Sequence, residues 1–312
     1  MKIAITGALG HIGSQLIRTL PLRFLDAEIL LLDNLSTQRY ASLFNLPARG
    51  RYRFLQSDIL TADLAEMLAG TDVVVHLAAI TDAANSFEHR EQVEQVNFEG
   101  TQRVARACLQ TGSALVFPST TSVYGSQAET VDEECPPGDL NPQSPYADSK
   151  LRAEQWLETV GGSEGLRFIV CRFGTIFGIS PGMRFHTAIN KFCWQAVMGQ
   201  PLTIWRTALH QARPYLDLGD AVQAIQFITE KKLYDGRVYN VVTVNTSVSR
   251  IVELIASHVP DVSIEYVDTK IMNQLSYHVA SQRFQAAGFQ FEGDLKRGIG
   301  DTINLLKGMR RW

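Results

Sequence analysis

The amino-acid sequence predicts an α/β protein whose main part is a doubly wound parallel sheet, followed by a smaller C-terminal lobe. In the first half of the chain, short apolar segments alternate with longer amphipathic segments, as strands and helices do in such sheets. A glycine-rich turn follows the first apolar segment. After about residue 175 this alternation stops, and Pro181, Pro201 and Pro214 interrupt the chain.

The apolar segments are short and continuous, which is typical of strands that are buried on both faces of a parallel sheet. We expect strands at Lys2–Thr6, Glu28–Leu32, Tyr52–Gln56, Val73–Leu77, Ala114–Pro118 and Phe168–Arg172. The amphipathic segments between them predict helices at Ile12–Thr19, Leu64–Ala69, Val93–Gln110 and Tyr146–Val160.

The second half of the chain has fewer regular patterns. They predict a helix at Asp220–Glu230, a strand at Val238–Val242 and a helix at Val248–His258. We interpret residues 1–175 as a nucleotide-binding domain and residues 176–312 as mainly a substrate-binding lobe over the carboxyl ends of the strands. Segments near 215–245 are expected to return to the first domain, so the chain crosses between the two parts more than once.

The composition is that of an ordinary globular protein, with 45% hydrophobic and 20% charged residues among 312. The formal net charge of -3 and the absence of long like-charge runs argue against nucleic acid or an anionic membrane surface as partner. No apolar run approaches the roughly 18 residues of a membrane span. The cysteines lie far apart, so we expect no metal site, no disulfide framework and a cytoplasmic location. They are Cys108, Cys135, Cys171 and Cys193.

The glycine-rich turn is Thr6–Gly13, between the first strand and the first helix. Glycines allow a tight turn and let a pyrophosphate approach the backbone, where the helix N-terminus favours negative charge. A turn of this composition can also merely connect a strand to a helix. Its place between strand and helix favours a Rossmann-type dinucleotide site, with expected contacts at Gly7, Gly10, His11, Ile12 and Gly13.

Asp33 ends the second predicted strand. A carboxylate there can accept hydrogen bonds from the adenosine ribose and would repel a 2′-phosphate, although a solvated aspartate at a strand end is the simpler alternative. Together with the glycine turn, Asp33 favours NAD over NADP. Asp58 and Ile59 follow the third strand, where an adenine edge could be contacted.

Tyr146 and Lys150 stand four residues apart at the start of a predicted helix, so their side chains share one face. A phenol titrates near pH ~10. A neighbouring ammonium and a positive nicotinamide ring would both stabilise the phenolate and make Tyr146 a general base. Such a pair is common by chance, but here it follows a nucleotide-binding half and the polar run Ser119–Ser122.

These motifs resemble the extended short-chain dehydrogenase/reductase family, in particular its NAD-dependent nucleotide-sugar epimerase/dehydratase branch, to which UDP-galactose 4-epimerase belongs. The resemblance extends over nearly the whole chain. It is carried by Thr6–Gly13, Asp33-Asn34, Asp58-Ile59, His76–Ala79, Val96–Thr101, Ser119–Gly125, Tyr146–Lys150 and Arg172–Gly178, and continues at Arg213 and Asp220.

The resemblance implies a role for each matching residue. Tyr146 would be the base, Lys150 would tune it and bind the nicotinamide ribose, and Thr120 would hydrogen-bond the reacting sugar hydroxyl. The remaining implied cofactor contacts are Asn34, Leu77, Ala78, Ala79 and Asn97, of which Asn97 would also support the active-site helix. The implied substrate-binding residues are Ser86, Thr120, Thr121, Ser122, Thr175 and Arg213.

The residues after Thr120 bear on the reaction type. Members of the branch that eliminate water or decarboxylate resemble one another in carrying an acidic residue there, whereas this chain has Thr121-Ser122 and no carboxylate before Gly125. The simplest implied reaction is epimerisation, most often at C4, in which a sugar hydroxyl is oxidised to a ketone with NAD and then reduced on the other face. An NAD(P)-dependent reductase or dehydrogenase of an activated sugar would use the same residues. A non-catalytic nucleotide-sensing protein would be expected to have lost Tyr146 or Lys150.

The sequence departs from the family pattern on the substrate side. Thr175 stands where an asparagine usually faces the substrate phosphate, and residues 273–277 lack an arginine that would often reach the nucleotide. Arg213 stands where an arginine often grips the diphosphate, which suits a bidentate guanidinium. The sugar and the nucleotide base therefore stay open.

The helices predicted at Val93–Gln110 and Tyr146–Val160 carry apolar residues at helical spacing. Most of these residues are expected in the core. The family resemblance implies in addition that the two helices pair with their copies in a homodimer.

Overall fold

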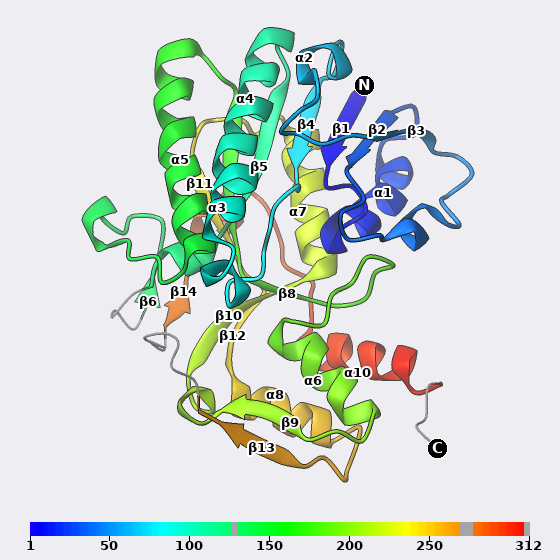
Figure 1. The fold of residues 1–312 in the computed structure, drawn as a ribbon, viewed down its shortest axis with the longest axis vertical. Helices are drawn as coiled ribbons and strands as arrows, with labels where there is room; N and C mark the ends of the chain where they lie inside the picture. Colours follow the sequence, from blue (N-terminus) through cyan, green and yellow to red (C-terminus); the bar gives the residue numbers. More distant parts are fainter. Residues whose placement is uncertain (126–129, 269–276, 309–312) are drawn as a thin grey trace.

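The computed structural model describes residues 1–125, 130–268 and 277–308. Its main part is a seven-stranded sheet in the order β11-β7-β5-β4-β1-β2-β3, in which every neighbouring pair is parallel (Figure 1). The expected α/β fold is thereby confirmed, and each predicted strand lies within two residues of its observed limits. The strands are β1 (Lys2–Thr6), β2 (Glu28–Asp33), β3 (Arg51–Gln56), β4 (Val73–His76), β5 (Ala114–Thr120), β7 (Phe168–Phe173) and β11 (Val238–Val241).

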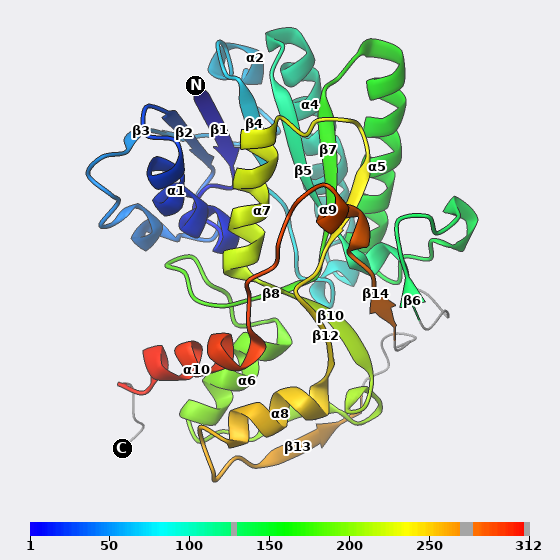
Figure 2. The same ribbon diagram turned by 180° about the vertical axis from the view of Figure 1, so that it is seen from behind.

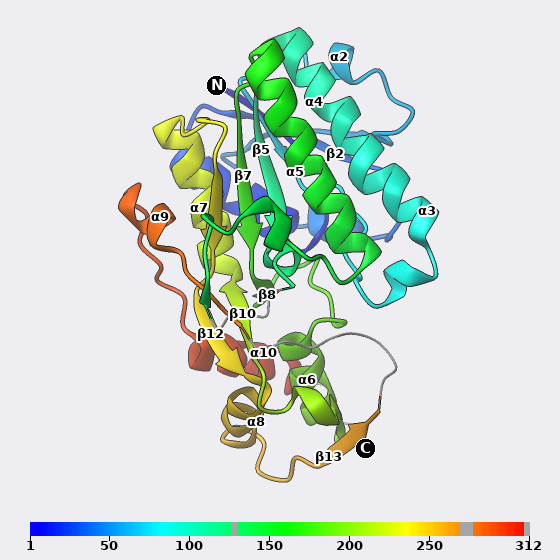
Figure 3. The same cartoon turned by 90° about the vertical axis from the view of Figure 1, so that its left-hand side faces the viewer.

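Helices cover both faces of this sheet, which explains why its strands are apolar throughout. On one face lie α1 (His11–Arg23) and α7 (Leu218–Lys231), and on the other α2 (Leu64–Met67), α4 (Gly100–Thr111) and α5 (Pro145–Glu164) (Figures 1 and 2). In Figure 3 the sheet separates α4 and α5 from α7. Each face has its own core, one around Leu16, Ile17 and Ile225, the other around Val104 and Leu157.

The strand order reverses at β1, which pairs with β2 on one side and with β4 on the other. Connections leave these strands in opposite directions, so a crevice opens at their carboxyl ends. Ligands of doubly wound sheets bind in this place.

The second lobe lies beyond the carboxyl ends of the strands, in the lower half of Figure 1. Its centre is a three-stranded sheet in the order β12-β10-β8, with a separate pair of β13 and β9. Its elements are β8 (Thr175–Phe177), α6 (Ala188–Val197), β9 (Leu202–Trp205), β10 (Ala212–Asp217), β12 (Val244–Ser247), α8 (Val248–Ala256), β13 (Ile264–Val267) and α10 (Leu295–Leu306). Since α7 and β11 pack with the large sheet, the chain crosses between the two parts repeatedly.

The helix predicted at Val93–Gln110 has a more complicated structure. It begins as α3 (Arg90–Val93), continues as the π-helical segment η3 (Glu94–Glu99) and ends as α4. A π-helical turn holds one residue more than an α-helical turn, and such turns are frequent at functional sites. Asn97, one of the predicted site residues, lies in this segment.

The other elements are short. They are β6 (Thr130–Val131), which pairs with β14 (His278–Val279), the helix α9 (Gln282–Ala286) and the 3₁₀ turns η1 (Tyr40–Leu43), η2 (Asn85–Phe87), η4 (Thr121–Val123), η5 (Pro137–Asp139) and η6 (Arg206–Ala208). Within the described ranges, no helix has both the length and the apolar character needed to cross a membrane.

Candidate active site

A cavity of about 430 Å³ opens at the carboxyl ends of β1, β4, β5 and β7, between the sheet and the second lobe. The predicted site residues that line it come from both parts of the molecule. They are Gly7, Gly10, His11, Ile12, Gly13, Leu77, Ala79, Thr120, Thr121, Ser122, Tyr146, Lys150, Thr175 and Arg213. The fold thus brings together side chains that stand up to about 200 residues apart in the sequence.

The glycine turn packs too closely for larger side chains at two positions. Gly7 has a φ of +65°, and a Cβ atom there would lie 2.6 Å from the backbone nitrogen of Ala78. A Cβ atom at Gly13 would lie 2.6 Å from the carbonyl oxygen of Ala8. Both contacts are far shorter than van der Waals distance, so glycine is required where the turn meets β4 and where α1 begins.

The start of α1 is suited to an anion. Gly10 is its cap residue and offers no side-chain hydrogen bond, and no acidic residue lies in the first turn. The helix dipole and the first backbone N–H groups therefore favour a negative group in the cavity, and Arg39, which also lines it, adds a positive charge. The residues present fit the pyrophosphate of a dinucleotide.

Asp33 holds the glycine turn from the neighbouring strand. Its Oδ2 accepts a hydrogen bond from the backbone of Leu9 at 3.0 Å, and its Oδ1 accepts one from Leu35 at 2.9 Å. Asn34 donates to the Oδ2 of Asp58 at 3.0 Å, so these two predicted cofactor residues lie side by side after β2 and β3. None of them is among the residues that line the cavity.

Three further predicted residues lie behind the cavity and do not line it. Asn97 is fully buried, accepts a hydrogen bond from the backbone of Ile80 at 2.8 Å and donates to the hydroxyl of Ser149 at 3.2 Å. It thereby joins the segment after β4 to α5. The side chains of Ile59 and Ala78 pack in the core behind α4 rather than in the cavity.

The structure does not bring Ser86 to the cavity as a substrate contact. Its hydroxyl donates to the carbonyl of Ala83 at 2.7 Å and accepts from the backbone of Tyr146 at 3.4 Å. Ser86 is buried and fastens the segment after β4 to the start of α5, which is a positioning contact.

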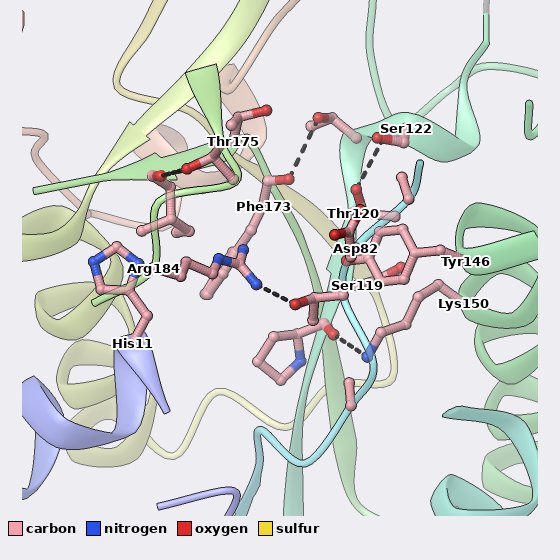
Figure 4. A pocket seen from close by; sticks show the side chains of 18 of the residues that line it. His11, Asp82, Ser119, Thr120, Ser122, Tyr146, Lys150, Phe173, Thr175 and Arg184 are labelled. Atoms are coloured by element: carbon pink, nitrogen blue, oxygen red, sulfur yellow. Dashed lines mark hydrogen bonds between the residues drawn. The ribbon is translucent and has the colours of Figure 1, made fainter. Parts of the chain in front are cut away.

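Tyr146, Lys150 and Thr120 meet where α5 passes the end of β5 (Figure 4). The hydroxyl of Thr120 hydrogen-bonds the phenol of Tyr146, and the Nζ of Lys150 donates to the carbonyl of Pro118 at 2.9 Å. The ammonium also lies 4.5 Å from the centre of the Phe117 ring. The pair predicted from a four-residue spacing therefore points into one site together with a hydroxyl from the sheet.

Burial acts on both ionisable groups of this pair. It lowers the pKa of Lys150 to about 8, against the opposing charge of Glu154. It raises the pKa of Tyr146, while the Arg184 guanidinium and the Thr120 hydrogen bond act in the opposite direction. The sequence predicts positive charge near the phenol from Lys150 and the nicotinamide ring, and the structure adds Arg184 as a source.

The substrate side of the cavity carries hydroxyls rather than carboxylates next to Thr120. Thr121 is buried and donates to the carbonyl of Phe173 at 3.3 Å, and Ser122 is exposed. Asp82 is the carboxylate among the described lining residues, and it lies on the segment after β4, where Asn85 donates to it at 2.8 Å.

Arg213 and Tyr277 close the cavity from the second lobe. The guanidinium of Arg213 lies 5.4 Å from the ring centre of Tyr277 and donates to the side chain of Gln211 at 3.3 Å. The hydroxyl of Tyr277 donates to the carbonyl of Thr121 at 3.2 Å. Residues 273–276, which lack the arginine often found in the family, lie outside the described residues.

Arg184 is a site residue that the sequence analysis missed. It lines the cavity, its Nη1 donates to the hydroxyl of Thr81, and its Nε is enclosed without a hydrogen-bond partner among the described residues. None of the ion pairs in residues 1–125, 130–268 and 277–308 involves it. Burial lowers its pKa, so an anionic ligand would find an enclosed and unpaired guanidinium opposite Tyr146 (Figure 4).

The segment that carries Arg184 is fastened to the glycine turn. His11 contacts the carbonyl of Gly178 at 2.9 Å through Nε2, and the hydroxyl of Ser180 donates to the carbonyl of His11 at 2.9 Å. The backbone of Gly182 donates to the hydroxyl of Ser14 at 3.0 Å. No local sequence signal in residues 178–184 could have revealed this, because the partners stand about 170 residues away.

Comparison with known proteins shows the family of the chain. A profile of the family described as "NAD dependent epimerase/dehydratase family" matches residues 3–241. The uncharacterized UDP-glucose epimerase YtcB of Bacillus subtilis (strain 168) is 33% identical over 77% of this chain and 76% of its own length. A trifunctional UDP-glucose 4,6-dehydratase/UDP-4-keto-6-deoxy-D-glucose 3,5-epimerase/UDP-4-keto-L-rhamnose-reductase of Arabidopsis thaliana is 30% identical over the whole chain, which spans 48% of that longer protein.

The fold also matches solved structures. A UDP-glucuronic acid 4-epimerase from Bacillus cereus, solved with UDP-glucuronic acid and NAD, superposes with a TM-score of 0.87 at 25% identity over 99% of both chains. Among the described residues, no cluster of side chains could hold a metal ion. The profile match covers well over half of the chain and shows to which family it belongs.

Proposed function

The chain belongs to the NAD-dependent epimerase/dehydratase family of nucleotide-sugar enzymes, and we propose that within it the chain is a nucleotide-sugar 4-epimerase. The observation that carries this proposal is the hydroxyl set beside the base. Tyr146 and Thr120 share a hydrogen bond, and the next two side chains, Thr121 and Ser122, have no carboxyl group.

The cofactor is NAD, and the glycine turn and the first N–H groups of α1 would hold its pyrophosphate. When bound, it supplies the oxidising and reducing equivalents of the reaction. The remaining chemistry is proton transfer and positioning by the chain's own residues. A carboxylate at Asp33, at the end of β2, would repel a 2′-phosphate, which favours NAD over NADP.

Tyr146 acts as the general base on the hydroxyl at C4 of the sugar, with the Thr120 hydroxyl holding the same oxygen. As the sugar is oxidised, the phenol oxygen of Tyr146 receives the proton, and it returns the proton when the ketone is reduced on the other face. Arg184 favours the phenolate because it carries a positive charge that acts on it, and we propose that Lys150, one turn further along α5, does the same. General base catalysis of this kind typically contributes about 10²–10⁴ to the rate.

The residue set argues against dehydration of the sugar. Elimination of water at C5 and C6 needs a second acid and base beside the one that serves C4. Thr121 and Ser122 lack the acidity for that step, and Asp82, the carboxylate among the described lining residues, is already hydrogen-bonded to Asn85. Without such a group the ketosugar turns over in the cavity and is reduced again.

Arg213 and Thr175 are proposed contacts for the diphosphate of the nucleotide. Both line the cavity from the second lobe, on β10 and β8, which pair in the same small sheet. A guanidinium can bind two phosphate oxygens at once, and a hydroxyl can donate one further hydrogen bond.

The proposal is tested with the purified chain and no added cofactor. The protein is denatured and the released nucleotide identified, and the native protein is incubated with UDP-glucose, UDP-N-acetylglucosamine and UDP-glucuronic acid. We expect bound NAD and formation of the C4 isomer of one sugar, followed by proton NMR.

Two other products would replace the proposal. A 4-keto-6-deoxy sugar would identify a dehydratase, an activity that is also named for the Arabidopsis relative. Consumption of added NAD(P)H in proportion to product would identify a reductase of an activated sugar, which uses the same residues.

Two expectations about the whole protein remain proposals. We propose a homodimer through the helices at 93–110 and 146–160, supported by the partly buried Phe98 and Trp156, which lie beside a surface groove at α4 and α5. We also propose a cytoplasmic location, which is supported by the four cysteines, all of them free.

A further inference from the structure

Three residues at the end of β5 are each attached to one side chain of α5. Thr120 hydrogen-bonds Tyr146, and the carbonyl of Pro118 accepts from Lys150 at 2.9 Å. Between them, the hydroxyl of Ser119 donates to the Oε1 of Glu154. Tyr146, Lys150 and Glu154 stand four residues apart and therefore share one face of the helix.

Glu154 is buried and paired with Arg172 of β7. The Nη2 of Arg172 donates to Oε2 of Glu154 at 2.7 Å, and its Nε lies 3.1 Å from the same oxygen. Both side chains are at most 6% exposed. Arg172 stands opposite Ser119 in the register of β5 and β7, so the carboxylate joins α5 to both strands directly below Thr120.

Glu154 also faces the ammonium of Lys150. Burial lowers the pKa of Lys150 to about 8, and the carboxylate of Glu154 acts against that shift. The other ionisable groups that face Lys150 are Tyr146 on the same helix and His76 on β4. Burial, together with the charge of Lys150, lowers the pKa of His76 to about 3, so this ring is neutral. Arg172 lies behind Glu154 and adds a positive charge. Among these groups, Glu154 is the one that carries a negative charge.

We propose that Glu154 is a positioning residue of this active site, which fixes the end of β5 below Thr120 and holds the Lys150 side chain in its charged form beside Tyr146. The inference rests on the proposed function for its catalytic meaning. A residue that only filled space here would need neither a charge nor a hydrogen bond to Ser119.

The charge on Lys150 decides where the proton of the Tyr146–Lys150 pair resides. The reactive form has a phenolate and an ammonium, and it competes with a form of equal total charge that has a phenol and a neutral amine. Loss of the nearby carboxylate destabilises the ammonium more than it affects the phenol, because the negative charge of Glu154 acts on Lys150. Without Glu154 the pair shifts to the unreactive form.

The test is a direct titration of Lys150 in the full chain saturated with NAD. Lysines are labelled with ¹³C at Cε, the Lys150 resonance is identified by its loss in Lys150→Met, and its shift is followed with pH. Glu154→Gln keeps the size of the side chain and an acceptor for Ser119. It is expected to lower the pKa of Lys150 by about one unit or more.

Two variants serve as controls. Glu164→Gln removes a carboxylate from the far end of the same helix, where Glu164 pairs with Arg106 at the surface, and should leave the Lys150 titration unchanged. Glu154→Asp keeps the charge and should retain most of the effect on Lys150. An unchanged Lys150 titration in Glu154→Gln overturns the inference.

Activity is measured separately, so that the two proposals fail independently. In Glu154→Gln we expect kcat to fall about tenfold with the KM of the nucleotide sugar unchanged, and the acid limb of the plot of kcat against pH to move to lower pH.

If no nucleotide sugar is epimerised by the unsubstituted chain, the proposed function fails while the Lys150 titration still decides the role of Glu154. If Glu154→Gln does not fold, Glu154→Gln/Arg172→Gln is compared with Arg172→Gln, and Lys150 should titrate lower in the double variant.

Discussion

At the scale of single residues, burial and charge act on Tyr146 in opposite directions. Burial raises the pKa of its phenol, whereas Arg184 and the hydrogen bond from Thr120 act in the opposite direction. A phenol in an apolar site would not ionise near neutral pH by itself. The base therefore depends on the positive groups and hydroxyls that surround it.

Replacing Tyr146 by phenylalanine should remove the base without changing the shape of the site. We expect Tyr146→Phe to lower kcat by about 10²–10⁴ while NAD remains bound, because the ring stays and only the proton acceptor is lost. The measurement is epimerase turnover together with the nucleotide released on denaturation. Turnover at the unsubstituted rate would contradict the assignment of Tyr146 as base.

Arg184 is expected to bind an anionic group, because an enclosed guanidinium without a paired carboxylate is unfavourable on its own. Arg184→Met keeps much of the side-chain volume and removes the charge. We expect the dissociation constant of NAD or the KM of the nucleotide sugar to rise by about tenfold or more, since a charged hydrogen bond contributes about 1.5–3 kcal/mol.

Calorimetric titration with NAD and initial rates with the sugar show which of the two ligands Arg184 contacts. Arg237→Met is the control, because Arg237 lies at the surface with a side chain that is 71% exposed. Unchanged binding of both ligands in Arg184→Met would show that the guanidinium serves only to hold Thr81.

The sequence predicted Tyr146 and Lys150 because their spacing on a helix is a local property. It also predicted the glycines of the turn, since Gly7 and Gly13 have no room for a side chain. It could not predict Arg184, whose place depends on contacts with residues near the other end of the chain. Ser86 matched a family position, but in this fold its hydroxyl serves the backbone around it.

At the scale of elements, the segment between β8 and α6 lies directly on the glycine turn. A Cβ atom at Gly182 would lie 2.3 Å from the carbonyl oxygen of Leu9 and 2.6 Å from that of Gly10. Backbone atoms on both sides leave no room for adjustment. The segment therefore depends on glycine at this position to bring Arg184 into the cavity.

Gly182→Ala should lift this segment from the turn. We expect weaker NAD binding and a lower kcat, with the fold of the large sheet retained, because the clash lies at the edge of the molecule's main core. Gly138→Ala is the matched control, since a Cβ atom there has no neighbour within 4 Å. Circular dichroism checks the fold, and calorimetry with NAD gives the affinity.

The hydrophobic periodicity of the sequence predicted the large sheet and its helices, but it did not predict the small sheet of the second lobe. The strands β8 and β12 have three and four residues and lie between segments without regular alternation. They form because β10 pairs with both of them, and that pairing joins segments about 30 to 40 residues apart. Short strands of this kind are specified by tertiary contacts rather than by local pattern.

At the scale of the whole molecule, two neutral histidines connect stability to pH. Burial lowers the pKa of His11 and of His76 to about 3, well below the usual value of 6.5. His76 is fully buried between the hydroxyls of Thr6 and Thr101, at 2.7 and 3.1 Å. Since the unfolded chain takes up protons on these rings below pH 6.5 and the folded chain does not, acid favours unfolding.

The free energy of unfolding should therefore fall as the pH falls from 6.5 towards 3. Each histidine contributes about 1.4 kcal/mol per pH unit in the middle of this range. His76→Asn should reduce the slope by about that amount, whatever it does to the stability itself. Urea unfolding at several pH values measures the slope, and an identical slope in the variant would show that His76 is protonated in the folded chain.

A homodimer through α4 and α5 should have twice the mass of one chain in light scattering at micromolar concentration. Phe98→Lys/Trp156→Lys places two charges on the proposed interface and should give monomers. Phe44→Lys is the control, because Phe44 is an exposed aromatic residue elsewhere on the surface, and it should leave the mass unchanged. A monomeric mass for the unsubstituted chain would remove the proposed dimer.

Because η3 is π-helical, the number of residues in this segment determines where Asn97 lies in the active site. It inserts one residue between α3 and α4, and Asn97 reaches Ile80 and Ser149 from within that turn. A deletion of one codon between residues 94 and 99 would leave every catalytic motif intact and allow a regular α-helix. It would also remove the π-helical turn from which Asn97 reaches Ile80 and Ser149. The number of residues in this segment is therefore as much a requirement of the Asn97 contacts as the identity of Asn97 itself.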